Sequence, residues 1–132
     1  MLDEQTLSTA TAVEKTMYRA LTELEELTQE LAEAVDRRDQ VTIRMFLSLR
    51  REQLNFLTRQ QTILRRQCAQ LSPEDGELLR QLLWEKEPPA CDGSQELVEQ
   101  AARNRSLLER LIRADARASR HLGGAGSFYE KK

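Results

Sequence analysis

The first half of the sequence contains neither glycine nor proline, since the earliest of either is Pro73. These two residues interrupt helices more often than any others, so nothing ahead of Pro73 breaks a helix. All five glycines fall at predicted boundaries, at positions 76, 93, 123, 124 and 126. The scarcity of these helix-breaking residues predicts long helices and an all-α fold.

Aromatic residues and long apolar runs are also scarce. Aromatic residues make up 5% of the chain and charged residues 32%, a balance typical of helical bundles and coiled coils. No apolar run approaches the ~20 residues that a membrane-spanning helix needs. The acidic start, Met1 to Glu4, lacks the features of a signal peptide. We therefore expect one cytoplasmic domain without membrane insertion.

A basic excess is missing as well. The formal net charge of −2 argues against a general nucleic-acid-binding protein, which needs a clear positive surplus. The two cysteines, Cys68 and Cys91, are too few for a disulfide framework, and we expect both to be reduced thiols. Cys68 falls on an apolar stripe and is predicted to be a core residue, whereas Cys91 falls in a loop.

Apolar residues in the first half recur in steps of three and four, which predicts two amphipathic helices, at about 9–37 and 40–71. Asp39 is the expected N-cap of the second helix. A second apolar stripe beside the first indicates that this helix touches two neighbours. The first seam comprises Val13, Met17, Ala20, Leu24, Leu27, Leu31 and Ala34, and the second stripe comprises Phe46, Leu49, Phe56 and Ile63.

In the second half, Ser72 and Pro73 mark the start of a short helix, 73–86, and the proline pair at 88–89 marks a loop. A last long helix follows at 94–122 and is stopped by Gly123. We expect an elongated antiparallel bundle of three long helices plus one short helix, with coiled-coil-like packing. Residues 1–122 form the domain, and residues 123–132 are expected to form a flexible tail.

Charge alternates in sign along these segments. Six Glu against one Lys and one Arg give −4 in residues 9–35, and six Arg against one Glu give +5 in residues 43–70. Residues 73–92 carry six acids against two bases, or −4, and residues 95–122 carry six Arg against four acids, or +2. Consecutive helices are therefore expected to attract one another.

Catalytic and metal-binding patterns are missing. The only histidine, His121, falls in the last turn of the last helix, where the helix dipole favours a cation. With Cys68 and Cys91 it lacks the spacing of a zinc site, and there is no glycine-rich phosphate loop. The acids of the first helix and the arginines of the second are interpreted as solvated faces. We expect no enzyme, no cofactor and no metal, which leaves binding as the function.

The layout resembles the FlgN-type flagellar export chaperones. The segment from Leu27 to Leu31 and onward to Arg66 is similar to the two long heptad helices of that family. The end of the chain is similar to its Asn, leucine pair, long amphipathic helix and Gly-Tyr tail. The residues that carry this second similarity are Asn104, Leu107, Leu108, Leu111, Leu122 and Tyr129. The chain departs from the pattern after Tyr129, where Glu130 stands and the final glycines are missing.

The resemblance implies a cytoplasmic type III export chaperone for the hook–filament junction proteins. Such a chaperone binds the amphipathic C-terminal helix of a hook-associated protein and hands it to the flagellar export apparatus, without catalysis. The implied partner-binding residues, together with a tail aromatic pair, are Asn104, Leu107, Leu108, Leu111, Ile112, Leu122, Phe128 and Tyr129. The same leucines also fit an ordinary core.

Two other interpretations stay open. One is a different secretion chaperone or helical adaptor, such as the FliT type, and the other is a structural coiled coil that self-associates as a homo-oligomer. Asn104 and Asp115 interrupt the apolar seam of the last helix, which predicts that this helix packs less tightly than the first two.

Overall fold

The computed structural model describes residues 1–121, with side chains through residue 116. These residues form four helices: α1 (Glu4–Arg37), α2 (Gln40–Gln70), α3 (Pro73–Trp84) and α4 (Gln95–His121). No strand occurs between residues 1 and 121. The predicted all-α bundle is confirmed. The predicted tail, 123–132, lies outside the described residues.

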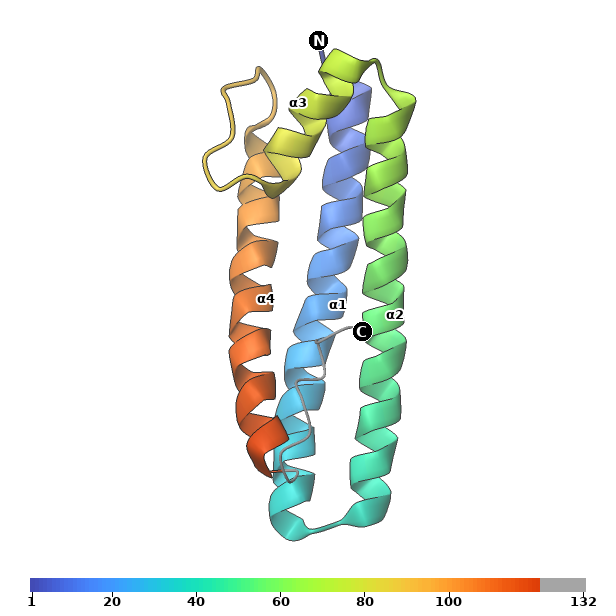
Figure 1. Cartoon of the computed structure of the whole chain (residues 1–132), viewed down its shortest axis with the longest axis vertical. Coiled ribbons are helices and arrows are strands. Elements are labelled where there is room, and N and C mark those ends of the chain that lie inside the picture. The colour runs from blue at the N-terminus through green and yellow to red at the C-terminus, as the bar shows by residue number, and fades with distance from the viewer. Residues whose placement is uncertain (122–132) are drawn as a thin grey trace.

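The three long helices run along the long axis, and α3 crosses one end beside the N-terminus (Figure 1). Consecutive long helices are antiparallel: α2 returns along α1, and α4 runs back beside α1 after α3 has carried the chain across the end. α1 packs against both α2 and α4. The neighbours of α2 are α1 and the short α3, so the prediction that this helix touches two neighbours is confirmed.

Helix α1 begins five residues earlier than the sequence prediction of about residue 9, which is wrong on this point. The side chain of Asp3 accepts a hydrogen bond from the Thr6 amide at 2.7 Å and caps the helix. Leu2 and Leu7 are both buried on either side of this cap, in the spacing of a hydrophobic staple. The cap and the staple together fix the start of α1 at Glu4.

The other predicted helix starts are confirmed. The Asp39 side chain accepts from the Thr42 amide at 3.2 Å and caps α2, after Arg38 reverses the chain in the left-handed conformation at φ 57°. The Ser72 hydroxyl accepts from the Asp75 amide at 3.2 Å and caps α3, with Pro73 in its first turn. α3 ends at Trp84, two residues before the predicted end.

The main core contains side chains from all four helices. A smaller cluster of Leu31, Ala34 and Ile43 fills the end near the α1–α2 turn. Gly76 lets α3 approach α2 closely, because a Cβ atom there would lie 2.5 Å from the Cys68 carbonyl oxygen. Cys68 is buried and Cys91 is half-buried, and both are free thiols, as predicted. Within residues 1–121, no helix has both the length and the apolar character that a membrane crossing needs.

A groove between α2 and α4 as the candidate functional site

Helices α2 and α4 both pack on α1, but their backbones do not approach each other closely. No Cα atom of α2 lies within 8 Å of a Cα atom of α4. The charges of the three segments agree with this arrangement, since the two basic segments (+5 and +2) flank the acidic one (−4). Electrostatic complementarity selects such pairings. The result is an open side of the bundle.

Apolar side chains from all four helices line a groove of about 360 Å³ on this open side. α1 contributes the floor through Met17 and Leu21. α2 and α4 contribute the two walls, and Leu83 and Trp84 of α3 border it as well. The apolar wall residues are Leu54, Leu57, Ala101 and Leu108.

One buried ion pair joins the two walls. Arg50 Nη2 of α2 lies 3.3 Å from Asp115 Oδ1 of α4, and the two residues are 1% and 0% exposed. The interpretation of the α2 arginines as a wholly solvated face is therefore wrong at Arg50. The sequence does contain the signal, since Arg50 follows Leu47 by three residues and precedes Leu54 by four, on the apolar seam.

A second buried polar pair lies in the groove floor. The Asn104 amide nitrogen donates to the Glu14 carbonyl oxygen at 2.7 Å and to its carboxylate Oε1 at 2.6 Å. Gln100 Nε2 donates to Asn104 Oδ1 at 3.0 Å. Burial raises the pKa of the Glu14 carboxyl, and the bond from Asn104 and the charge of Arg105 oppose that rise.

These pairs overturn two sequence interpretations. Asn104 and Asp115 do not loosen α4, because both are buried and hydrogen-bonded to other helices. The acids of α1 are not all solvated either, because Glu14 is buried. In both cases a polar residue on an apolar seam marks a contact with another helix. The sequence of one segment alone does not reveal which residue is the partner.

The structure divides the predicted partner-binding residues into two groups. Asn104, Leu107 and Leu111 are buried, with both leucines in the core cluster. Leu108 lines the groove, and Ile112, one turn further along the same side of α4, is 43% exposed. The groove residues on α2 and α3, such as Leu54 and Trp84, were not predicted. Three further predicted residues, Leu122, Phe128 and Tyr129, lie outside the described residues.

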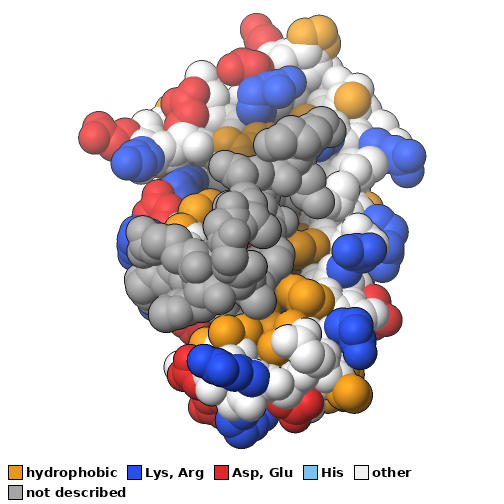
Figure 2. Space-filling model, turned by 60° about the horizontal axis from the view of Figure 1, so that its bottom comes forward, with side chains coloured by type: hydrophobic (Ala, Val, Ile, Leu, Met, Phe, Trp, Pro, Cys, Tyr) orange, Lys and Arg blue, Asp and Glu red, His pale blue; other side chains and the backbone are white. Residues whose placement is uncertain are grey.

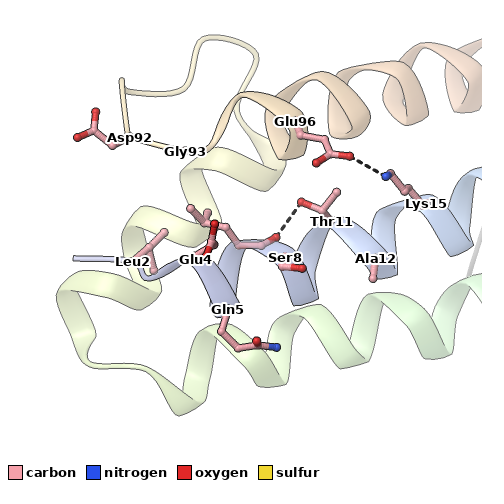
Figure 3. Close-up of a pocket in the computed structure, with 11 residues that line it drawn as sticks. Leu2, Glu4, Gln5, Ser8, Thr11, Ala12, Lys15, Asp92, Gly93 and Glu96 are labelled. Atoms are coloured by element: carbon pink, nitrogen blue, oxygen red, sulfur yellow. Dashed lines mark hydrogen bonds and ion pairs between the residues drawn. The ribbon is translucent and has the colours of Figure 1, made fainter.

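A second cleft, of about 760 Å³, lies between the first turns of α1, the loop before α4 and the start of α4 (Figure 3). Its lining is largely polar. Lys15 Nζ pairs with Glu96 Oε2 at 2.6 Å, but both side chains are largely exposed, and the Thr11 hydroxyl donates to the Leu7 carbonyl oxygen within its own helix. No three His, Cys, Asp or Glu side chains among the described residues could hold a metal ion.

No family model matches this chain, and no curated protein or solved structure is significantly similar to it. The groove between α2 and α4 is the candidate site, because its apolar lining from four helices and the buried Glu14–Asn104 pair in its floor form a surface suited to another helix.

Proposed function

We propose that this protein is a chaperone that holds an amphipathic helical segment of a partner protein in the groove between α2 and α4. The observation that carries the proposal is that both helices pack on α1 while their backbones stay apart from each other, so that Met17, Leu54 and Leu108 border an open groove. A fourth helix laid there would complete a four-helix bundle and bury these side chains.

The groove has the length that such a segment needs. The groove-lining residues of α2 run from Leu54 to Arg65, so this stretch of the helix spans about 16 Å at ~1.5 Å per residue. A partner helix of about three turns fits that span. Binding by burial of an apolar stripe requires no catalytic group.

The resemblance to FlgN-type chaperones supplies the identity of the proposed partner. We propose that the bound segment is the amphipathic C-terminal helix of a flagellar hook-associated protein, held in the cytoplasm before transfer to the export apparatus. The positions of Leu108 and Ile112 on the open side of α4 support this part of the proposal, because the family resemblance implicates the same helix.

The test compares three variants for binding to the isolated C-terminal segment of a hook-associated protein. Leu108→Asp places a charge in the groove and Ile112→Asp places one a helical turn beyond it on the same side of α4, and both should weaken binding by at least about tenfold. Ile63→Asp is the matched control, because Ile63 and Ile112 are both 43% exposed, but Ile63 lies about 160° around α2 from the groove residues Gln61 and Arg65. Circular dichroism should show unchanged helicity in all three.

Equal loss of binding in the Ile63→Asp control, or no loss at the two groove positions, would contradict the proposed site. The predicted contribution of the tail is tested separately by Phe128→Ala and Tyr129→Ala, which should also weaken binding. If the segment does not bind the unaltered chain, the flagellar partner is wrong, whatever the groove binds.

A further inference from the structure

Arginines occupy three of four positions spaced seven residues apart along the groove edge of α2, and Thr58 occupies the fourth. Thr58 and Arg65 both line the groove, and Arg51 and Arg44 precede Thr58 by seven and fourteen residues. Residues seven apart on a helix share one side, so Arg44 and Arg51 continue the same edge. All three arginines are exposed, and none takes part in an ion pair within the described part of the chain.

The α3 end of the groove is basic on both walls. Arg105 of α4 lines the groove opposite Arg65, and its guanidinium donates to the carbonyl oxygens of Leu83 at 3.3 Å and Glu85 at 3.5 Å. These two bonds hold its positive charge at the end of α3. The one acidic residue of the described lining is Glu14, and burial raises its pKa, which disfavours its negative form.

On the face drawn in Figure 2, blue side chains follow the α2 side of the molecule, beside orange side chains nearer the middle. A helix lying in the groove would therefore have one polar flank against the arginine edge of α2. An acidic flank gains Coulomb attraction there, and a basic flank is repelled. Exposed charges separated by a helix width contribute more to orientation and partner choice than to affinity.

We propose, building on the function proposed above, that the groove selects an amphipathic helix whose polar flank on the α2 side is acidic. The partner would carry Asp or Glu beside its apolar seam at intervals of about seven residues, in register with Arg51 and Arg65. The arginine edge then determines which way round the helix lies, while the apolar groove supplies the buried surface.

Two other occupants fit the arginine edge less well. A second copy of this chain offers an exposed apolar stripe on α2 that includes Met45, Leu49 and Ile63. Arg59 lies beside this stripe, 5.8 Å over the Phe56 ring, so self-docking would bring arginine toward arginine. The chain's own residues 122–132 carry one Glu and two Lys. Charge complementarity therefore favours a separate acidic helix.

The experiment uses the full chain and three synthetic helical peptides of about 18 residues with one shared leucine seam. The flanks of the peptides carry Glu, Gln or Lys, and binding is followed by fluorescence anisotropy of a peptide label. The Glu peptide should bind about tenfold more tightly than the Gln peptide, and the Lys peptide most weakly. About 0.5 M salt should reduce the difference to less than about threefold.

Charge reversal on the protein gives the matched control. Arg51→Glu with Arg65→Glu should remove the preference for the Glu peptide or invert it. Arg59→Glu with Arg66→Glu makes the same charge change on residues that are also seven apart, but each lies about 100° around α2 from the groove edge. This second pair should leave the order of the three peptides unchanged, and circular dichroism should confirm that both double variants are folded.

The outcomes separate the two proposals. Equal binding of the three peptides that is lost in Leu108→Asp would overturn the acidic flank but leave the groove in place. If the two double variants changed the order of the three peptides equally, the acidic flank would also be overturned, because net charge alone would then explain the preference for the Glu peptide. A lack of binding by every peptide, or binding insensitive to Leu108→Asp, would overturn the groove itself. Sedimentation that shows a dimer dissociated by Leu108→Asp would assign the groove to a second copy.

Discussion

The two sides of α4 differ in burial, although both carry large aliphatic residues of the same apolar pattern. Toward α1, Leu107 and Leu111 are buried in the core cluster. Toward α2, Leu108 is half-buried and Ile112 is exposed. Apolar content does not explain the difference, because both sides carry large aliphatic residues. The neighbours differ in charge instead: α4 packs on the acidic α1, and it faces the basic α2 across a groove.

The largest loss of stability is expected at the buried ion pair between α2 and α4. Asp115→Ala removes the carboxylate that pairs with the buried Arg50 guanidinium, and loss of one partner of a buried ion pair costs about 3–5 kcal/mol. Urea denaturation should show this loss. The double variant Arg50→Met with Asp115→Leu should lose much less, since no buried charge remains. A loss below about 1 kcal/mol in the single variant would mean that the pair is not buried in solution.

Truncation of one leucine in the core and of one at the groove compares the packing of the two regions directly. Leu24 of α1 is fully buried, so Leu24→Ala should lower the free energy of unfolding by about 2–5 kcal/mol. Leu108→Ala should lower it by about 1 kcal/mol, because this side chain is only half-buried at the groove. Equal losses at the two positions would show that the groove side is packed as tightly as the core.

A smaller change in the free energy of unfolding, which depends on pH, is expected when Glu14 is replaced. Burial raises the pKa of its carboxyl above the ordinary value of 4.5, so the folded state binds this proton more tightly than the unfolded state. The cost of ionising Glu14 is therefore absent below about pH 4.5, grows as the pH rises to the raised pKa, and persists above it.

Glu14→Gln retains an oxygen that can accept from Asn104 and abolishes the titration. The variant should be more stable than the unaltered chain at about pH 7, and this difference should shrink toward about pH 4. Urea denaturation at several pH values measures it. A difference that grows on acidification would show that the pKa of Glu14 is lowered and not raised.

The smallest expected effect is a difference between the rates at which the two thiols are modified. Cys68 is buried under α3, and burial raises the pKa of its thiol, so a thiol reagent should modify it slowly in the folded protein. Cys91 is half-buried in the loop before α4 and should be modified faster. Mass spectrometry of the labelled peptides gives both rates. Equal rates would indicate that α3 does not stay packed on α2.

The sequence predicted those features that depend on neighbouring residues. Asp39 and Ser72 are caps, Pro73 opens α3, and Cys68 lies on an apolar seam, because each signal lies within a few residues of its effect. The start of α1 was missed although Leu2, Asp3 and Leu7 form a staple and cap. The clear heptad seam begins only at Val13, and it outweighed the weaker signal ahead of it.

The groove could not be predicted in the same way. Glu14 and Asn104 are ninety residues apart, and Arg50 and Asp115 are sixty-five apart, so neither pair is visible in any one segment. The prediction placed partner-binding residues on the last helix and in the tail, whereas the groove is built from four helices. Leu108 was found because it lies on that helix, and Leu54 and Trp84 were missed because their neighbours come from elsewhere in the chain.

Trp84 offers the most direct measurement of whether the groove between α2 and α4 is the binding site. It is the only tryptophan of the chain, it is partly exposed, and it lines the groove at the α3 end. Titration with the tryptophan-free Glu-flanked peptide should move its emission to shorter wavelength and saturate at one peptide per chain, because the bound helix excludes water from the ring. The shift should disappear in Leu108→Asp and persist in Ile63→Asp. Saturable binding by anisotropy with no change in Trp84 emission would contradict the groove as the site.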